Sequence, residues 1–320
     1  MRRSIAITGA TGFVGSVLLK KLVPMDWHVR ALVRPASMHK RPSQVVPEWI
    51  PGDLEDMESL RRLVAGVEAV AHCAGTVRGA SLTDFERINQ EGVARLVLAA
   101  RSQQPVPRFF LISSLAAREP HLSYYAASKR NGEKALVANA DQMPWVIFRP
   151  PAIYGPGDRE LLPLFQWMCR GIAPVFGSDG RRVSLLYVED MAEAVICYLK
   201  RGMGWGRSYE LHDGHAGGYL WEDVIDAIAR IKGRPIHRIK VPLSLFKLGA
   251  TLNQAAARMC HRMPMLTPGK VRELIHPNWV GDNTALTKDT GWIPQVTLEE
   301  GLKQTLQQGR ATGCKGSHGK

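Results

Sequence analysis

A glycine-rich turn between a strand and a helix constrains the fold most. The run "SIAIT" (Ser4–Thr8) is short and rich in β-branched residues, and Gly9, Gly12 and Gly15 follow it before the helical run "SVLLKKLV". In such a turn one glycine permits the tight bend, one lets the backbone approach a pyrophosphate, and one lets the helix pack on the strand. The start of the helix then offers unpaired N–H groups and positive potential to phosphates. We expect a dinucleotide site here, and a glycine turn without a ligand is the alternative.

Strands and helices alternate through the first half of the chain. Further strand candidates lie at His28–Arg34, Val67–Gly75, Arg108–Ser114 and Trp145–Pro150. Between them, Thr83–Ala100 starts with Thr-x-x-Glu, the sequence of a capping box, and continues with helical spacing. The alternation predicts an α/β fold, a doubly wound parallel Rossmann sheet with helices on both faces and a smaller C-terminal substrate lobe. The expected division is a dinucleotide-binding domain (1–153, with 184–200 returning to it), a mainly substrate-binding lobe (154–308) and a disordered tail (309–320).

The chain is basic, and its charge is uneven. Its 320 residues include 42 Lys and Arg against 29 Asp and Glu, a net charge of +13. Ten of the cations lie between Arg230 and Gly281, where Glu273 is the one acid. Such a balance suggests nucleic acid, phosphates, an anionic membrane or simply a solvated basic face. The chain has no basic region with heptads, no zinc spacing and no aromatic-rich RNA-binding signature, so we expect no nucleic-acid partner.

The cysteines and the hydropathy pattern predict a cytoplasmic protein without a metal. Five cysteines stand singly, which favours free thiols in a reducing compartment. We find no signal peptide and no apolar run long enough to span a membrane. The pair His212 and His215 in "HDGH" has no evident third ligand, so we expect a loop there.

The stretch "SYYAASKRNGEKAL" (Ser123–Leu136) is typical of a helix and carries a tyrosine–lysine pair. Tyr125 and Lys129 are four residues apart and share a helix face, whereas Tyr124 points away. A free tyrosine, with a pKa of about 10, is a poor base at neutral pH. A nearby cation lowers that pKa, so we expect Lys129 to activate Tyr125. Taken alone, the pair also fits an ordinary surface contact.

The motifs together resemble the extended short-chain dehydrogenase/reductase superfamily, which includes sugar epimerases, dihydroflavonol reductases and 3β-hydroxysteroid dehydrogenases. The resemblance rests on the spacing Gly-x-x-Gly-x-x-Gly combined with Tyr125-x-x-x-Lys129. It extends in order over about residues 1 to 305, through "GDL" (Gly52–Leu54), "HCAG" (His72–Gly75), "LISSLAA", "RPPAIYGPGD" (Arg149–Asp158), "SLLYVEDMAEAV" (Ser184–Val195) and "GWIPQVTLEEGL" (Gly291–Leu302).

The resemblance implies which residues act. Tyr125 would exchange a proton with the substrate oxygen, Lys129 would also reach the nicotinamide ribose, and Ser114 would hold the oxygen, with Ser113 as the alternative. The implied catalytic set is Ser114, Tyr125, Lys129 and Asn89. The implied cofactor-binding set is Gly9, Thr11, Gly12, Phe13, Val14, Gly15, Arg34, Asp53, Leu54, Ala74, Gly75, Ser113, Tyr125, Lys129, Pro150 and Ile153.

The end of the second strand indicates which dinucleotide binds. A site selective for NAD usually has an acid about 20 residues after the glycines, bonded to the ribose 2′-OH. Here the strand ends at Arg34 with no acid nearby, and His39, Lys40 and Arg41 follow. A guanidinium binds a 2′-phosphate well, so we expect NADP(H), with NAD(H) as the second choice.

The second half bears on the substrate. Counting back from Asp190 places Val183 where nucleotide-sugar members of the superfamily have a diphosphate-binding arginine, and Arg181 and Arg182 are out of register. The segment 241–266 is apolar with sparse cations, and Leu245, Leu248, Leu252 and Ala255 follow a helical stripe. It is the core of the lobe, a lipid-facing surface or an apolar substrate channel. Asp190 is expected as a helix N-cap or structural carboxylate, and Tyr154 either lines the site or packs.

The leading functional prediction is an NADP-dependent reductase or dehydrogenase that transfers hydride between the cofactor and a ketone or secondary alcohol of a hydrophobic or steroid-like small molecule. A nucleotide-sugar epimerase or dehydratase is the alternative. The third hypothesis is a non-catalytic, dinucleotide-binding subunit of a larger assembly. The resemblance is also compatible with a homodimer formed through two helices per subunit, and segment 241–266 is the candidate for peripheral membrane contact.

Overall fold

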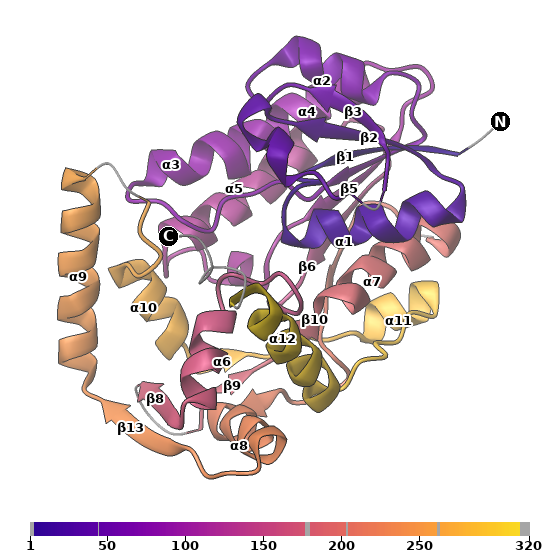
Figure 1. Ribbon diagram of the computed structural model, residues 1–320. Helices are drawn as coiled ribbons and strands as arrows, with labels where there is room; N and C mark the ends of the chain where they lie inside the picture. The colour runs from indigo at the N-terminus through magenta and orange to yellow at the C-terminus, as the bar shows by residue number, and fades with distance from the viewer. Residues whose placement is uncertain (1–2, 44, 177–179, 203, 261–262, 314–320) are drawn as a thin grey trace, which may run out of the picture.

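Seven parallel strands form the central sheet of the computed structural model (Figure 1). The structure describes residues 3–313 except 44, 177–179, 203 and 261–262. Every neighbouring pair in the sheet is parallel, which confirms the predicted doubly wound fold. From edge to edge the strands are β11 (Arg207–Glu210), β6 (Trp145–Arg149), β5 (Arg108–Ile112), β4 (Ala69–His72), β1 (Ser4–Thr8), β2 (His28–Val33) and β3 (Glu48–Pro51).

The strand order reverses between β1 and β4. From β1 the chain runs outward to β2 and β3, and it then crosses back to β4 on the other side of β1. In open α/β sheets, ligands bind beyond the carboxyl ends of the strands at such a switch point. The fold therefore directs the search for a site to the loops that follow Thr8 and His72.

Helices cover both faces of the sheet. Along β1 the side chains alternate, so Ile5 and Ile7 join one buried core and Ala6 joins the other. The first core is closed by α1 (Phe13–Leu22), α7 (Val188–Arg201) and α11 (Thr284–Thr290). The second is closed by α2 (Met57–Val64), α4 (Gly92–Arg101) and α5 (Tyr124–Asn139). Among the described residues, no helix has the length and apolar character needed to cross a bilayer.

The connection into α4 differs from the expected single helix with a cap at Thr83. It consists of α3 (Leu82–Glu86) and a π-helical turn (Arg87–Glu91) before α4 begins. The capping box is Ser81–Asp84, because the Ser81 hydroxyl accepts from the Asp84 N–H and the Asp84 carboxylate accepts from the Ser81 N–H. The sequence analysis placed the cap at Thr83, two residues too late. Ser81 and Asp84 show the same pattern as Thr83 and Glu86, a hydroxyl residue followed three residues later by an acid. Short 3₁₀ turns lie at Val23–Met25, Pro35–Lys40 and Leu115–Arg118.

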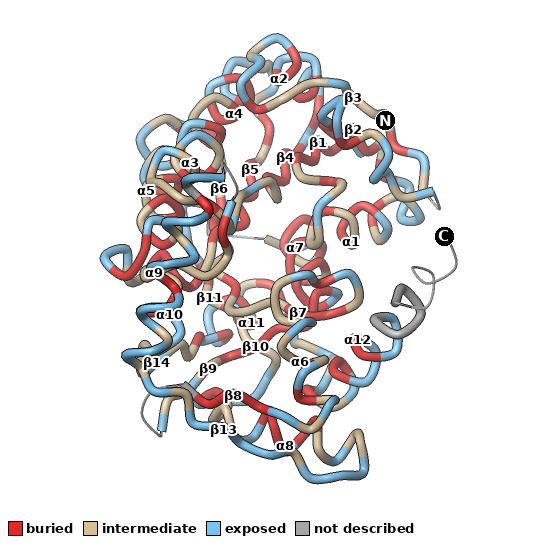
Figure 2. The backbone as a smooth tube through the Cα atoms, turned by 60° about the vertical axis from the view of Figure 1, so that its left-hand side comes forward, coloured by how far each residue is buried: buried red, intermediate tan, exposed pale blue. Residues whose placement is uncertain are grey.

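A second, smaller lobe has its own buried core, which includes Tyr154, Phe165, Tyr187, Ile228 and Leu302 (Figure 2). Its helices are α6 (Leu162–Cys169), α8 (Trp221–Lys232) and α12 (Leu298–Gly313). Its strands pair as β7 (Ala152–Tyr154) with β10 (Leu185–Tyr187), β8 (Ile172–Phe176) with β13 (His237–Val241), and β9 (Arg182–Val183) with β12 (Tyr219–Leu220) and β14 (Asn278–Trp279). Helix α12 ends inside the predicted tail, of which 314–320 lies outside the described residues.

Two further helices, α9 (Leu243–Met259) and α10 (Pro268–Ile275), stand beside α3 and α5 at the edge of the molecule (Figure 1). Helix α9 is tied to the loop before α3, because the Gln254 side chain donates to the Ala80 carbonyl oxygen at 2.9 Å. The sequence left segment 241–266 open between lobe core, lipid surface and substrate channel, and its part Leu243–Met259 is a helix at the periphery.

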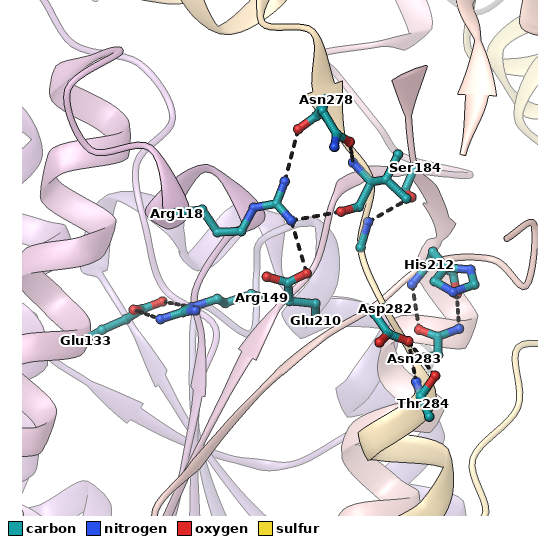
Figure 3. A network of polar contacts seen from close by, with 12 residues as sticks. Arg118, Glu133, Arg149, Ser184, Glu210, His212, Asn278, Asp282, Asn283 and Thr284 are labelled. Carbon is teal, nitrogen blue, oxygen red and sulfur yellow. Dashed lines mark hydrogen bonds and ion pairs between the residues drawn. The ribbon is translucent and has the colours of Figure 1, made fainter. Parts of the chain in front are cut away.

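One arginine joins the sheet to the lobe (Figure 3). Arg118, in the turn after β5, donates to the Glu210 carboxylate at 3.2 Å and to the carbonyl oxygens of Val280 at 2.8 Å and Asn278 at 3.0 Å. Three bonds to three separate groups fix the turn against β11 and the segment after α10. The end of β5 is thereby held in a defined position relative to the lobe.

Candidate active site

The glycine turn at the switch point is built for close approach. Gly9 has a φ of 73°, and a Cβ there would lie 2.6 Å from the Ala74 nitrogen. A Cβ on Gly15 would lie 2.2 Å from the Gly9 carbonyl oxygen, so both positions require glycine. Gly12 is the N-cap of α1, is exposed, and has no side chain capping the helix. The uncapped helix start fits a dinucleotide phosphate, and Thr11, Phe13 and Val14 lie half-buried around it.

The residues predicted for the adenosine end lie on neighbouring strands. Arg34 directly follows β2 and is exposed, and Asp53 and Leu54 follow β3. The two strand ends are joined by a hydrogen bond from the Gly52 nitrogen to the Val33 carbonyl oxygen at 3.0 Å. The Asp53 carboxylate accepts from the Glu55 nitrogen at 3.1 Å, and Leu54 is buried. No acid stands at the end of β2, as the sequence indicated.

Asn89 fixes the loop after β4. Its amide oxygen accepts from the Thr76 nitrogen at 2.9 Å, and its amide nitrogen donates to the Thr76 carbonyl at 2.9 Å and to the Ser128 hydroxyl at 3.0 Å. Ala74 and Gly75 lie in the loop so held. A Cβ on Gly75 would lie 3.2 Å from the Asn89 amide oxygen and 3.7 Å from Lys129 Nζ. The buried Asn89 side chain therefore shapes this wall of the site.

Pro150 and Ile153 lie where β6 leads into β7. The Pro150 carbonyl oxygen accepts from the Leu115 nitrogen at 2.8 Å, which holds the turn after Ser114 beside the end of β6. Pro150 is buried and Ile153 is half-buried, packed against the core under α1. The structure thus brings the predicted segments after β1, β4, β5 and β6 to one edge of the sheet.

Lys129 is buried beneath this edge. Its Nζ donates to the Ile112 carbonyl oxygen at 2.8 Å, at the end of β5. Burial lowers the pKa of this ammonium to about 8, and the Glu133 carboxylate opposes that change only in part. A cation with little water and one carbonyl partner is poised to bind a further oxygen.

Tyr125 is half-buried, with its ring edge against Phe85 at a centroid distance of 6.2 Å. Burial raises the pKa of its phenol, the Ser114 hydrogen bond opposes that change, and the Glu273 carboxylate adds to it. The expectation that Lys129 would lower this pKa is therefore wrong. Desolvation outweighs the other effects, and the cation that acts on the phenol is Lys270, while the Lys129 ammonium is bound to Ile112. Tyr124 is 47% exposed, and of the two tyrosines Tyr125 is the one that lies next to Ser114.

The two adjacent serines have different partners. The Ser113 hydroxyl donates to the buried Glu133 carboxylate at 2.6 Å, and Arg149 donates to both oxygens of that carboxylate at 2.8 and 2.7 Å (Figure 3). Ser114 is half-buried and its hydroxyl accepts from the Ala116 nitrogen at 3.2 Å, next to Tyr125. The geometry favours Ser114 over Ser113 as the serine that faces a substrate.

A pocket opens beside Tyr125, and part of its wall was missed by sequence reasoning. It is bounded by Phe85, by Ser123, Tyr124 and Tyr125 at the start of α5, and by the segment from Pro264 to Glu273. Lys270 and Phe85 were not predicted as site residues. Two signals were present for the helix that carries Lys270: Thr267 and Pro268 form a typical helix start, and Glu273 is the one acid of a basic stretch.

The remaining candidates are structural. Tyr154 is fully buried and packs against Phe165, so it does not line the pocket. The Asp190 carboxylate accepts from the nitrogens of Gln295 at 3.1 Å and Val296 at 3.0 Å, so it is a structural carboxylate and not a helix cap.

Metal and disulfide chemistry find no support among the described residues. His212 accepts from the Gly214 nitrogen at 3.0 Å, and His215 stacks on Tyr219 at 4.2 Å. No group of three or more metal-binding side chains occurs in the part of the chain that the structure describes. The four cysteines in that part form no disulfide with one another, and Cys314 lies outside it.

The chain resembles known proteins along its whole length. Residues 5–211 match the NAD dependent epimerase/dehydratase family. The chain is 37% identical to a ceramide reductase of Caulobacter vibrioides (98% of this chain and 96% of the relative). It is 28% identical to a 2-alkyl-3-oxoalkanoate reductase of Stenotrophomonas maltophilia (94% and 97%). The fold is that of a UDP-glucuronic acid 4-epimerase from Bacillus cereus in complex with UDP-glucuronic acid and NAD, with a TM-score of 0.74, 18% identity and coverage of 97% and 99%.

Proposed function

The chain belongs to the NAD dependent epimerase/dehydratase family, and on that premise we propose that it is an NADP(H)-dependent oxidoreductase for a hydrophobic ketone or secondary alcohol. The observation that carries the proposal is the position of Tyr125. Its phenol lies next to Ser114, which follows β5 at the carboxyl edge of the sheet. Tyr125 also lines a pocket that has Val77, Phe85 and Met265 in its walls.

The chain's own groups are suited to the reductive direction. When bound, the nicotinamide supplies the hydride. Since burial raises the pKa of Tyr125, its phenol is protonated at neutral pH and donates its proton to the carbonyl oxygen as negative charge develops there. The Ser114 hydroxyl donates to the same oxygen and holds it in line with Tyr125. Lys129, protonated below about pH 8 and close to Gly75, would hold the ribose of the bound dinucleotide by donating to its hydroxyls.

The relatives support a hydrophobic substrate with a polar end. Both are named as reductases, one of a ceramide and one of a 2-alkyl-3-oxoalkanoate. Ceramides and alkylated oxoalkanoates combine apolar chains with an amide or a carboxylate. The pocket beside Tyr125 combines the same two characters, because Phe85 and Met265 share its walls with Lys270 and Glu273.

NADP(H) is the proposed dinucleotide. Arg34 directly follows β2, is exposed, and its guanidinium has no hydrogen-bond partner among the described residues. An available guanidinium matches a 2′-phosphate bidentately, whereas a carboxylate at this place would repel it.

The nucleotide-sugar hypothesis has less support from the pocket. Val183, at the expected position of the diphosphate-binding arginine, packs against the core of the lobe. The neighbouring arginines bond to backbone instead: Arg181 donates to the Leu274 carbonyl at 2.6 Å, and Arg182 to the Gly218 carbonyl at 3.1 Å. The third hypothesis, a non-catalytic subunit, does not require Tyr125 to lie next to Ser114, or Lys129 to be buried at the end of β5.

Peripheral contact with an anionic membrane is part of the proposal. In helix α9, Ala250 and Ala257 are buried, whereas Leu245, Leu248 and Leu252 are 55 to 61% exposed. These three leucines, with exposed Lys240 and Lys247 nearby, define the α9 face. Anionic headgroups complement its charge, whereas a second copy would bring like charges together. The homodimer through two helices per subunit stays a prediction independent of this face.

A pair of tyrosine variants tests the function. NADPH oxidation is followed with long-chain ketones, β-keto amides, steroid ketones and nucleotide 4-keto sugars. Tyr125→Phe is expected to lower kcat about 100- to 10,000-fold on the substrate that the wild type reduces. The matched Tyr124→Phe, at the neighbouring tyrosine of the same pocket, should retain most of the activity, because the proposal assigns no proton transfer to it. Equal activity in wild type and Tyr125→Phe, or turnover confined to the nucleotide sugar without net NADPH consumption, would reject the proposal.

A further inference from the structure

Lys270 faces Tyr125 across the pocket. It comes from α10, at the far end of the chain from the glycine turn, and it lines the same pocket as Tyr125 and Phe85. Neither the sequence motifs nor the proposed proton transfer uses it. A second cation beside the proton donor therefore needs an explanation.

The local structure holds α10 tightly against the start of α5. A Cβ on Gly269 would lie 2.8 Å from the Ser123 Cβ, so the two helix starts are in direct contact. The Arg272 guanidinium donates to the Leu122 carbonyl oxygen at 2.7 Å, and the Thr267 hydroxyl caps α10 by accepting from the Lys270 nitrogen at 3.2 Å. The position of Lys270 relative to Tyr125, two residues after Ser123, is fixed by these contacts.

The carboxylate beside Lys270 is already well satisfied. Glu273 is buried, and its two oxygens accept from the Ser123 hydroxyl and from Lys270 Nζ, the latter at 2.9 Å. The other acid near this pocket, Glu160, is paired with Arg78 at 2.9 Å. An ammonium has three N–H donors, and Glu273 is the one side-chain partner of Lys270 among the described residues. Two donors are left for the interior of the pocket.

We propose that Lys270 is a substrate-specificity residue that binds a second oxygen of the substrate, an amide carbonyl or a carboxylate close to the carbonyl that Tyr125 protonates. The inference rests on the proposed function and deepens it. Glu273 and Ser123 orient the ammonium. By binding the second oxygen, the ammonium determines which carbonyl of an elongated apolar substrate lies beside Tyr125. A ketone without the second oxygen gains nothing from Lys270.

Binding measurements separate this role from a merely structural ion pair. Three probes of equal chain length are titrated by calorimetry into the NADP⁺-loaded protein: a long-chain β-keto amide, the corresponding β-keto acid, and the ketone that lacks the second oxygen. Hydrogen bonds to a charged group predict that the wild type binds the amide or the acid about 10- to 100-fold more tightly than the plain ketone. In Lys270→Met that preference should disappear while the affinity for the plain ketone is unchanged.

The controls keep the test decisive. Lys270→Met leaves Glu273 buried without its cation, so the double variant with Glu273→Gln is measured beside it. Lys303→Met removes an exposed lysine of α12 and should change nothing. A preference that survives in both Lys270 variants, or an equal loss of affinity for all three probes, would overturn the inference. If no probe is reduced with NADPH, the proposed function fails, while the binding preference still decides the role of Lys270.

Discussion

The hydroxyl of Ser113 donates a buried hydrogen bond of 2.6 Å to the carboxylate of Glu133. We therefore assign Ser113 a structural role at the end of β5. Its neighbour Ser114 is the one beside Tyr125. We predict that Ser114→Ala lowers kcat about 100- to 1,000-fold, because it removes a donor to the developing oxyanion. Ser113→Ala should keep most of the activity and lose about 1 to 3 kcal/mol of unfolding free energy. Steady-state kinetics and urea unfolding of both variants check this, and the reverse pattern would refute it.

Burial of Lys129 predicts a pH dependence of stability. Its pKa is lowered to about 8 in the folded protein from an ordinary value of 10.5. Below pH 8 the lysine is charged in both states and the folded state bears the desolvation cost. Between pH 8 and 10.5 the folded state releases its proton first, so stability should rise with pH. The gain is on the order of 3 kcal/mol relative to Lys129→Met, measured by urea unfolding at each pH. Parallel profiles for the two proteins would contradict the assignment.

Replacing Arg34 should change the choice of dinucleotide. We predict that Arg34→Glu weakens NADPH binding about 10- to 100-fold and leaves NADH binding unchanged or improved, because a carboxylate repels the 2′-phosphate and suits the 2′-OH. Fluorescence titration with both dinucleotides measures it. Lys303→Glu, a charge reversal on the lobe, is the matched control. Tighter NADH than NADPH binding in the wild type would reject NADP(H) as the cofactor.

Charging the α9 face should abolish lipid binding without affecting the site. The double variant Leu248→Glu and Leu252→Glu is expected to lose co-sedimentation with phosphatidylglycerol vesicles, which the wild type should show and which should fall with added salt. Ile293→Glu, at an isoleucine that is 59% exposed elsewhere, is the matched control. Activity on a short, soluble ketone should be retained. Wild-type protein that stays in the supernatant with anionic vesicles would disprove membrane contact.

The local pattern of the first half sufficed to predict the strands that carry the dinucleotide site. Runs such as Ser4–Thr8 and Arg108–Ser114 are apolar, β-branched or aromatic, and their neighbours in the sheet are also short runs of the same kind. Edge strands were missed. β3 is short and includes Glu48 and Pro51, and β11 carries Arg207 and Glu210, so neither has the composition of a buried strand.

The tyrosine–lysine pair was predicted from helical spacing, but its electrostatics could not be. The four-residue spacing places Lys129 on the same helix face as Tyr125. The Lys129 ammonium nevertheless donates to the Ile112 carbonyl oxygen of β5, a contact that the helical pattern does not predict. Lys270, which lines the pocket with Tyr125, is held by Glu273, and Glu273 accepts from Ser123, 150 residues away in the sequence. Such contacts arise from tertiary packing, and a single sequence leaves them open.

The pocket wall that faces Tyr125 is drawn largely from one continuous stretch, Gln254 to Glu273, while the dinucleotide turn lies near the other end of the chain. Substrate contacts and dinucleotide contacts therefore depend on separate parts of the chain. Under the proposed function, replacing that stretch alone would change which substrate is preferred and leave the dinucleotide turn and Tyr125 in place.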